Sequence, residues 1–419
     1  MGVDYWAPGM RYLVEVSPGR LEEVQRALRA LGIRAVKKVL NYISVEMPEA
    51  MVARVEALPG VVRVVPERTY RVAAVIPVEK KLQMFLRFGG PVNPMALTWA
   101  AGFRKDRWPT SQSRKVLGAD EADRMGVDGR GVKVAVIDTG FDLLGCPQKP
   151  VIDYVYSTIE AQPVGHDGNG HGTHCLTTIA GGRFPTPWGW LEGVAKGVRV
   201  AAIKCLGFGI GTGATSDVME AIVAAYNWGA KVVSMSLGTT VAPGERHDPD
   251  TCPLCSLVKA LSERGVLFIV AAGNDGEGYA SCPGVSEGAI TVAALDKNLR
   301  VADFSSRNHP DYEERQKPDV AAPGVDIGSA TCGLIDVMEW VDGPKLGFIS
   351  GTSMATPHVA GLVALWVEYL RRQGVPDSEI NVALIRDIIR RYGRGWDSVY
   401  GYGVPKFSWV VQYYEEVLR

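Results

Sequence analysis

Three segments of the chain each supply one member of the side-chain set that makes a hydroxyl group nucleophilic. Asp138 ends the apolar segment VAVID, His171 lies in the glycine-rich segment NGHGTH, and Ser353 lies in GTSMATPH, where a long apolar stretch begins. A histidine that takes the serine proton and an aspartate that orients the histidine together activate a serine for attack on a carbonyl. A serine at a helix N-terminus also meets the positive end of the helix dipole, which favours developing negative charge. These residues together predict catalysis by a serine nucleophile.

The segments that must position these residues have the pattern of a parallel sheet with helices on both faces. Short, mostly apolar segments of the kind buried on both faces occur at residues 132–137, 200–203, 232–235, 266–271 and 289–293. Helical patterns lie between them, as at residues 216–228 and 256–264. We therefore expect an α/β fold with a doubly wound parallel sheet. Ligands of such sheets bind at the carboxyl ends of the strands, which is where Asp138 stands.

The composition is that of a globular protein without a charge bias. The 419 residues include 45 Lys and Arg against 46 Asp and Glu, and 47% of the residues are hydrophobic. The balanced charge argues against a nucleic-acid or anionic-membrane partner, and no apolar run reaches the roughly 18 residues of a membrane span. The chain has only eight Asn and eight Gln. Because these amides are thermolabile, their scarcity is typical of a thermostable protein.

The N-terminal part of the chain predicts a separate small α+β unit. Its strand and helix patterns alternate in the order βαββαβ, at residues 10–16, 21–31, 33–40, 42–47, 49–58 and 61–65. This order is typical of a ferredoxin-like split βαβ fold. We expect three regions, namely this unit over residues 1–70, a proline- and glycine-containing linker over residues 71–113 with a short helix near 79–88, and a catalytic domain over residues 114–419.

Four motifs together give the sequence a family resemblance. AVIDTG, NGHGTH, AAGN and GTSMATPHVAG occur in this order, and they carry an Asp, a His, an Asn and a Ser in turn. In these motifs the chain resembles the subtilisin-like serine proteases, the subtilases of peptidase family S8. The resemblance extends over about residues 117–403 and implies a subtilisin-like fold and a serine endopeptidase.

The resemblance assigns roles to the residues of the four motifs. It implies that Asp138 is the orienting carboxylate, His171 the general base and Ser353 the nucleophile. Asn274, in AAGN, would form the oxyanion hole with the backbone N–H of Ser353. Cys175, which directly follows HGTH, would pack beneath the catalytic histidine.

The substrate-binding positions are also implied by the resemblance. SLG at residues 236–238 is similar to the family's strand that hydrogen-bonds the substrate backbone, and GFGIGTG at residues 207–213 is similar to the facing edge. Pairing with a peptide backbone is largely independent of side chains, so broad specificity is expected. The positions carried over are Gly209, Gly211, Gly213, Ser236, Leu237, Gly238, Ala272 and Gly273.

The N-terminal unit resembles the pro-domain of secreted subtilases. In that family it acts as an intramolecular chaperone and inhibitor, and its tail is the first substrate. We therefore expect a zymogen that cleaves itself between residues 70 and 75. The expected partners are protein and peptide substrates and the chain's own pro-domain, with no nucleic acid, no membrane and a monomeric enzyme. The resemblance favours secretion, but the first ten residues hold no apolar signal segment, so an intracellular location stays open.

Cofactors are not expected for the chemistry, and structural calcium is an open question. Residues 182–191 (GRFPTPWGWL) replace the Asn-rich calcium loop of the family, and residues 141–153 lack the family's His-Pro-Asp pattern. These departures put one common calcium site in doubt, so a structural Ca²⁺ remains possible with unknown ligands.

Three rival interpretations deserve comparison with the protease. The segment GIGTGA at residues 209–214 fits a dinucleotide fingerprint, but no acidic residue ends the following strand at 231–237. The histidines near His171 and the pair Cys252 and Cys255 suggest zinc, but no second pair completes a four-ligand set. The alternative for these two cysteines is a disulfide, with each other or with Cys282 or Cys332. A folded but inactive binding protein is disfavoured because every triad position holds a competent residue.

Overall fold

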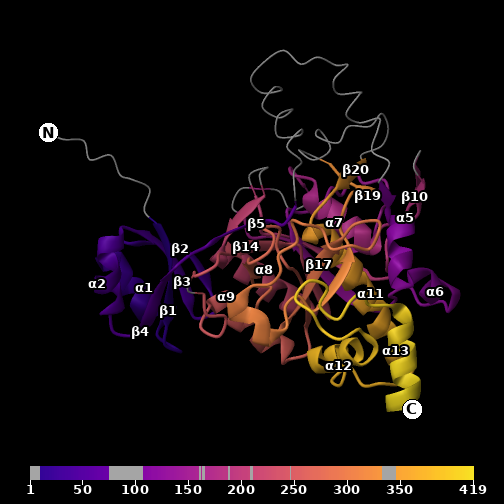
Figure 1. Ribbon diagram of the computed structural model, residues 1–419. Helices are drawn as coiled ribbons and strands as arrows, with labels where there is room; N and C mark the ends of the chain where they lie inside the picture. The colour runs from indigo at the N-terminus through magenta and orange to yellow at the C-terminus, as the bar shows by residue number, and fades with distance from the viewer. Residues whose placement is uncertain are drawn as a thin grey trace.

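The structure is a computed structural model that describes residues 10–74, 107–159, 162, 166–186, 189–207, 211–245, 247–332 and 346–419. Two bodies of unequal size follow each other along the chain (Figure 1). The first is a small N-terminal unit, and the second holds the large sheet and most of the helices. Within the described residues, no helix has both the length and the apolar character needed to cross a membrane.

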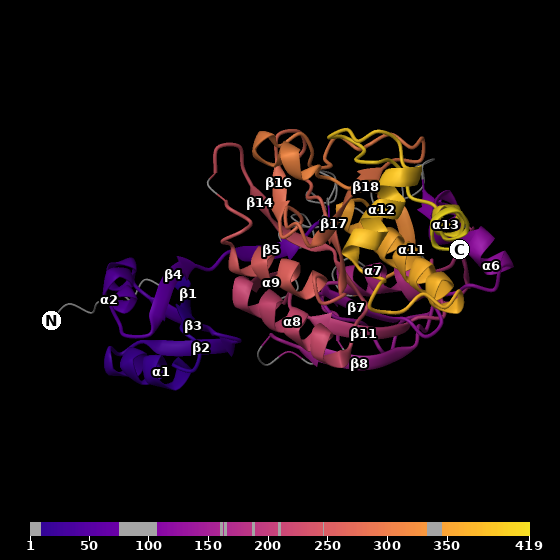
Figure 2. The same ribbon diagram turned by 90° about the horizontal axis from the view of Figure 1, so that it is seen from below.

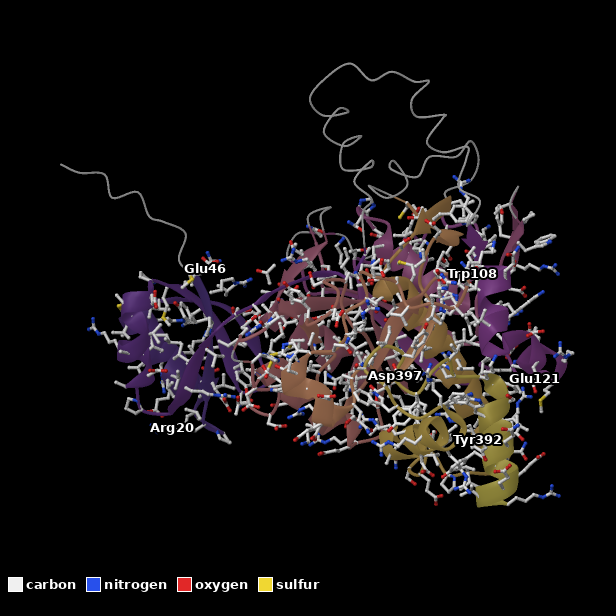
Figure 3. The ribbon with its side chains drawn as sticks, in the orientation of Figure 1. Arg20, Glu46, Trp108, Glu121, Tyr392 and Asp397 are labelled. Atoms are coloured by element: carbon white, nitrogen blue, oxygen red, sulfur yellow. The ribbon has the colours of Figure 1, made fainter. Side chains whose placement is uncertain are left out.

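The N-terminal unit is the predicted ferredoxin-like fold. Its antiparallel sheet has the order β2-β3-β1-β4, and helices α1 and α2 pack on it. Figure 3 shows Arg20 and Glu46 in this unit, at the opposite end of the molecule from Trp108, Glu121 and Tyr392. The elements are β1 (Met10–Val16), α1 (Leu21–Ala30), β2 (Arg34–Val39), β3 (Tyr42–Met47), η1 (Glu49–Met51), α2 (Val52–Glu56) and β4 (Val61–Pro66).

The second body is built on the predicted parallel sheet. Seven strands pair in the order β18-β17-β15-β13-β7-β11-β8, and every pairing between them is parallel. The strands are β7 (Lys133–Asp138), β8 (Ile152–Ser157), β11 (Arg199–Lys204), β13 (Val232–Met235), β15 (Leu267–Ala271), β17 (Ala289–Leu295) and β18 (Val320–Pro323).

Helices cover both faces of this sheet, which explains why its central strands are apolar throughout (Figure 2). One face packs against α7 (His171–Ala180) and the largely buried α11 (Thr352–Arg372), and the other packs against α8 (Thr215–Trp228) and α9 (Pro253–Ser262). The remaining helices are α5 (Thr110–Ser113), η2 (Arg114–Leu117), α6 (Ala119–Arg124), η3 (Pro310–Arg315), α12 (Val382–Tyr392), α13 (Phe407–Tyr413) and η4 (Tyr414–Leu418). The doubly wound α/β fold is thereby confirmed.

Three smaller sheets lie beside the large one. The most informative has the order β12-β5-β14-β16, in which β5 follows the N-terminal unit and the other three strands belong to the second body. The others have the orders β10-β9 and β20-β19-β6. Their strands are β5 (Thr69–Val72), β6 (Trp108–Pro109), β9 (Phe184–Thr186), β10 (Gly189–Leu191), β12 (Thr212–Ala214), β14 (Leu237–Val241), β16 (Ala280–Cys282), β19 (Ile327–Ala330) and β20 (Leu346–Ile349).

The region predicted as a linker, residues 71–113, has ordered ends. At its start Arg71 and Val72 belong to β5, and at its end Trp108 and Thr110 are buried in β6 and α5. The two ends of the region predicted as a linker thus contain strand and helix residues, a feature that is not visible in proline and glycine content. The helix expected near residues 79–88 lies outside the described residues.

Candidate active site

The predicted carboxylate and imidazole meet at the carboxyl end of the central strand β7. Asp138 is the last residue of β7, and His171 is the first residue of α7. Nδ1 of His171 lies 2.7 Å from Oδ1 of Asp138, and both side chains are buried. Because the carboxylate can only accept, Nδ1 donates the proton of this bond, and Nε2 is the atom that has a lone pair when the imidazole is neutral. Nε2 has no hydrogen-bond partner among the described residues.

A network around Asp167 holds α7 against the tip of β7. Oδ1 of Asp167 accepts hydrogen bonds from the Thr139 hydroxyl (2.8 Å) and from the backbone N–H of Gly170 (2.8 Å). A carboxylate at the start of a helix satisfies otherwise unpaired N–H groups. Gly172 permits the close approach, since a Cβ there would lie 2.3 Å from the carbonyl oxygen of Gly140. The motif NGHGTH therefore fixes the position of the imidazole.

The surroundings of His171 favour its protonated form. Burial is the largest single influence and opposes the charge of the imidazolium, but the charge and hydrogen bond of Asp138, together with those of Cys175, outweigh it and raise the pKa of His171 well above its ordinary value. The predicted place of Cys175 is observed, with its Sγ 3.7 Å from Nδ1 of His171 and 3.4 Å from the carbonyl oxygen of Ser353. The second histidine, His174, bonds the carbonyl oxygen of Ile327 at 2.9 Å, and burial lowers its pKa to about 3.

Ser353 lies at the N-terminal end of α11 and is fully buried. Its Oγ donates a hydrogen bond of 2.9 Å to the carbonyl oxygen of Ser236. The hydroxyl is therefore directed at the backbone of Ser236, and among the described residues it makes no hydrogen bond with Nε2 of His171. The triad residues are brought to one site, with Asp138 and His171 already bonded.

Asn274 lies beside the start of the same helix. Its Oδ1 accepts hydrogen bonds from the backbone N–H of Thr352 (2.9 Å) and from the Thr352 hydroxyl (3.0 Å). These bonds fix the amide so that its NH₂ group remains for another acceptor. Gly273 precedes it with a φ of +103°, a left-handed conformation that favours glycine.

Strand β5 fills the groove beside these residues. It lies between β12 and β14 and pairs antiparallel with both, with Gly213 opposite Tyr70 and Leu237 opposite Val72. The backbone N–H of Val72 bonds the carbonyl oxygen of Gly211 at 3.3 Å. An extended peptide is thus held mainly by main-chain hydrogen bonds, which is the β-augmentation mode of peptide binding.

The residue after β5 lies against the serine. The N–H of Ala73 bonds the carbonyl oxygen of Ser236 at 3.2 Å, and the carbonyl oxygen of Ala73 accepts the backbone N–H of Ser353 at 3.1 Å. The carbonyl of Ala73 is therefore polarised by a hydrogen bond from the residue that carries the predicted nucleophile. This geometry resembles a peptide bond bound for attack.

The predicted substrate positions have different surroundings. Gly211, Gly213, Ser236, Leu237 and Gly238 all pair or bond with residues 70–73. No side chain fits at Gly213 or Gly238. A Cβ at Gly213 would lie 2.1 Å from the carbonyl oxygen of Cys205, and one at Gly238 would lie 2.0 Å from the hydroxyl oxygen of Ser281.

Two further predicted positions, Ala272 and Gly273, bond residues other than this peptide. Ala272 bonds Val292, and Gly273 bonds Thr352 and Ser306, so both serve to place Asn274. Gly209 lies outside the described residues.

Gly351 is a functional position to which sequence reasoning gave no role. A Cβ at this residue would lie 2.4 Å from the carbonyl oxygen of Ala73 and 2.9 Å from Cα of Ala74. Its φ is +154°, at the edge of the region that favours glycine. The signal was present, because Gly351 opens the motif GTSMATPH, but only the position of Ala73 shows what the glycine avoids.

The dinucleotide interpretation and the metal site suggested by the histidines near His171 are not supported, because the residues concerned are engaged elsewhere. The supposed phosphate-binding segment near residues 211–214 is paired with β5, and Asp167 and His174 are engaged in the bonds described above. The segment expected to replace a calcium loop contains the hairpin of β9 and β10, with Arg183 stacked 4.2 Å over the ring of Trp190. This hairpin offers no carboxylate for calcium.

Comparison with known proteins relates the chain to one protease family. The model of the subtilase family, peptidase S8, matches residues 129–403. Pyrolysin from Pyrococcus furiosus is 31% identical over 325 residues, which cover 59% of this chain and 22% of pyrolysin. Subtilisin Savinase from Lederbergia lenta is 35% identical over 247 residues, which cover 59% of this chain and 80% of that protein.

A solved structure shares the fold over nearly the whole chain. Fervidolysin from Fervidobacterium pennivorans, a keratinolytic enzyme related to subtilisin, superposes with a TM-score of 0.70 at 24% identity, over 98% of this chain and 62% of its own. The chain thus spans less than two thirds of the length of pyrolysin and of the fervidolysin chain. Because the family model matches more than half of the chain and includes all four motifs, this chain belongs to the subtilase family.

Proposed function

We propose that this protein is a serine endopeptidase in which Ser353 is the nucleophile, His171 the general base and Asp138 the orienting carboxylate. Asn274 and the backbone N–H of Ser353 form the oxyanion hole. The observation that carries the proposal is the bond of 3.1 Å between the carbonyl oxygen of Ala73 and the N–H of Ser353, made by a peptide that lies in a groove between two strands. The N–H of Ser353 lies in the first turn of α11 and needs an acceptor from outside the helix, and a peptide carbonyl supplies it here.

The reaction follows from these positions. Oγ of Ser353 attacks the carbonyl carbon while Nε2 of His171 takes the hydroxyl proton, and the oxyanion is stabilised by the Ser353 N–H and the Asn274 amide. The imidazolium, held by Asp138, then protonates the leaving nitrogen, and the peptide bond breaks. Water hydrolyses the acyl-enzyme with His171 again as base. No cofactor enters these steps, and we assign no ligands to a structural calcium.

We further propose that the first substrate is the chain itself, cleaved between Ala73 and Ala74. This bond lies inside the expected window of residues 70–75. The N-terminal unit then remains as an inhibitor, because its contacts with the second body do not depend on the cleaved bond. The groove favours an aromatic side chain at the position of Tyr70, which is fully buried, and tolerates a charged one at the exposed Arg71.

Charged groups support this docking of the N-terminal unit. Nζ of Lys37 lies 2.6 Å from Asp217 and 2.7 Å from Glu220, both on α8. Oε2 of Glu67 accepts from the backbone N–H (3.0 Å) and the hydroxyl (2.9 Å) of Ser216, in the first turn of α8. Negative charge at a helix N-terminus is favourable, so Glu67 contributes to inhibition as well as to placement.

The test combines labelling and self-cleavage. Incubation of the full chain should produce a new N-terminus at Ala74, and a serine-directed phosphonate should then modify Ser353, as located by mass mapping. The Ser353→Ala variant should stay folded, uncut and unlabelled. Serine labelling at another residue, or turnover by Ser353→Ala close to that of the unchanged chain, would contradict the assignment.

The remaining properties follow from the family resemblance. We propose that the processed enzyme is a secreted monomer that acts on proteins and peptides with broad specificity. Gel filtration of the processed enzyme and a comparison of medium with cells in the source organism would test these points.

A further inference from the structure

A cluster of three thiols and one imidazole lies away from the triad. Sγ of Cys282 is 3.8 Å from Sγ of Cys252 and 3.4 Å from Sγ of Cys255, and Sγ of Cys255 is 3.7 Å from Nε2 of His247. All four ligand atoms lie within 4.8 Å of one another. The three cysteines are free thiols. Sequence reasoning set zinc aside because the pair Cys252 and Cys255 lacked two further ligands, and the fold supplies them.

The distances fit a tetrahedral metal site. With Zn–S bonds of about 2.3 Å and a Zn–N bond of about 2.0 Å, the edges of the tetrahedron are about 3.8 Å between sulfurs and about 3.5 Å from sulfur to nitrogen. The observed separations of 3.8, 3.4 and 3.7 Å lie close to these values. Thiolate and imidazole are the ligands that favour zinc over calcium or magnesium.

Three separate elements bring the ligands together. Cys252 is the N-cap of α9 and Cys255 lies in its first turn, so the C-x-x-C spacing turns both sulfurs to the same side of the helix start. Cys282 ends β16, where it pairs with Thr239 of β14. The loop that carries His247 is held by the Tyr312 hydroxyl, which donates to the carbonyl oxygen of His247 at 2.6 Å. Cys255 and Cys282 are fully buried.

We propose that His247, Cys252, Cys255 and Cys282 bind one structural zinc ion. Four protein ligands fill the tetrahedron and leave no position for water, which is the arrangement of a structural site. A disulfide between any two of the cysteines would use two sulfurs and leave the third thiol and the imidazole without a function. The proposal uses no part of the catalytic mechanism, so zinc binding and proteolysis can fail independently.

The site supports one wall of the groove. β16, which carries Cys282, pairs with β14, and β14 pairs with β5. The hydroxyl of Tyr70 lies 3.4 Å from Sγ of Cys282. The ion would therefore hold α9, β16 and the loop at residue 247 together directly behind the pocket that buries Tyr70, and a zinc-bound thiolate there would accept the hydrogen bond of the tyrosine.

The experiment measures metal content in the full chain with Ser353→Ala, which prevents self-digestion. Elemental analysis should find about one zinc ion per chain after extensive dialysis. Cys255→Ser and Cys282→Ser should reduce this to less than about a tenth, whereas Cys205→Ala, a buried thiol outside the cluster, should retain it. A mercurial should release the zinc to a colorimetric chelator in proportion to the thiols titrated.

Two further measurements remain decisive if a cysteine variant fails to fold. The unsubstituted cluster, after exchange into Co²⁺, should show the intense visible bands and thiolate charge-transfer absorption of a tetrahedral site. Alkylation under denaturing, chelating conditions without reductant should modify all three cysteines. A metal-free chain in which two of the three resist alkylation until reduced has a disulfide, and that result would overturn the proposal. A metal-free chain with all three thiols reactive, and no Co²⁺ spectrum, would overturn it equally.

Discussion

Replacing the tyrosine of a peptide substrate that corresponds to Tyr70, the fourth residue before the cleaved bond, tests the groove most directly. The natural sequence at the site is Tyr70-Arg71-Val72-Ala73, and peptides of this sequence with a reporter group after the alanine are the substrates. We expect the peptide in which alanine replaces this tyrosine to be cleaved by the processed enzyme with a lower kcat/KM. The reason is that Tyr70 is fully buried and packs in the same apolar cluster as Leu206 and Leu237.

The magnitude follows from the buried area. Truncation to alanine removes about 120 Å² of apolar contact, which at about 25 cal/mol per Å² is about 3 kcal/mol. Ordering the tyrosine side chain costs about 0.5–1 kcal/mol that alanine does not incur, so the net loss is about 2–2.5 kcal/mol. This free energy corresponds to a decrease of about 30–70-fold in kcat/KM.

Two matched peptides separate the causes. Tyr→Phe keeps the ring and removes only the hydroxyl near Cys282, so kcat/KM should fall about 2–5-fold, as expected for one weak hydrogen bond. Arg→Ala at the exposed second residue should change kcat/KM by less than about twofold, because little area is lost there. The reasoning is refuted if the alanine peptide at the first position is cleaved as fast as the tyrosine peptide.

Three further predictions concern the catalytic groups. Asn274→Ala should lower kcat by about 10²–10³, the loss known for the corresponding donor of subtilisin, with little change in KM, as steady-state kinetics will show. The rate of self-cleavage should rise with pH, with a midpoint above the ordinary pKa of about 6.5, because His171 must lose a proton that burial opposes but that Asp138 and Cys175 together stabilise. Asp138→Asn should move this midpoint to lower pH and reduce the rate by about 10⁴; an unchanged midpoint would argue against the assigned pair. Gly351→Ala should abolish self-cleavage while the unfolding temperature stays near that of Ser353→Ala, because the new methyl group would lie 2.4 Å from the Ala73 carbonyl oxygen; cleavage at the normal rate would show that the groove binds the peptide in another register.

The sequence by itself determined the family and the fold class. Motif order and strand periodicity are local properties, and they predicted the parallel sheet, the ferredoxin-like unit and the candidate triad of Asp138, His171 and Ser353. The predictions of the parallel sheet and of the N-terminal unit are confirmed by the observed strand orders, and the roles of Asp138, His171 and Ser353 stay a prediction. The match of residues 129–403 to the subtilase family confirms the family resemblance drawn from the four motifs.

Only the tertiary structure decided what lies opposite these motifs. Three findings depend on contacts between segments that are distant in the sequence. The carbonyl oxygen of Ala73 accepts the N–H of Ser353, and Gly351 leaves space for that carbonyl. Cys282 and His247 lie beside the pair Cys252 and Cys255. Pairing of β5 with β12 and β14 leaves no trace in composition, so the sequence could not predict it. The periodicity of a sequence segment predicts which face of a helix or strand a side chain occupies. Which residues that side chain contacts is set by the packing of helices and strands that are far apart in the sequence.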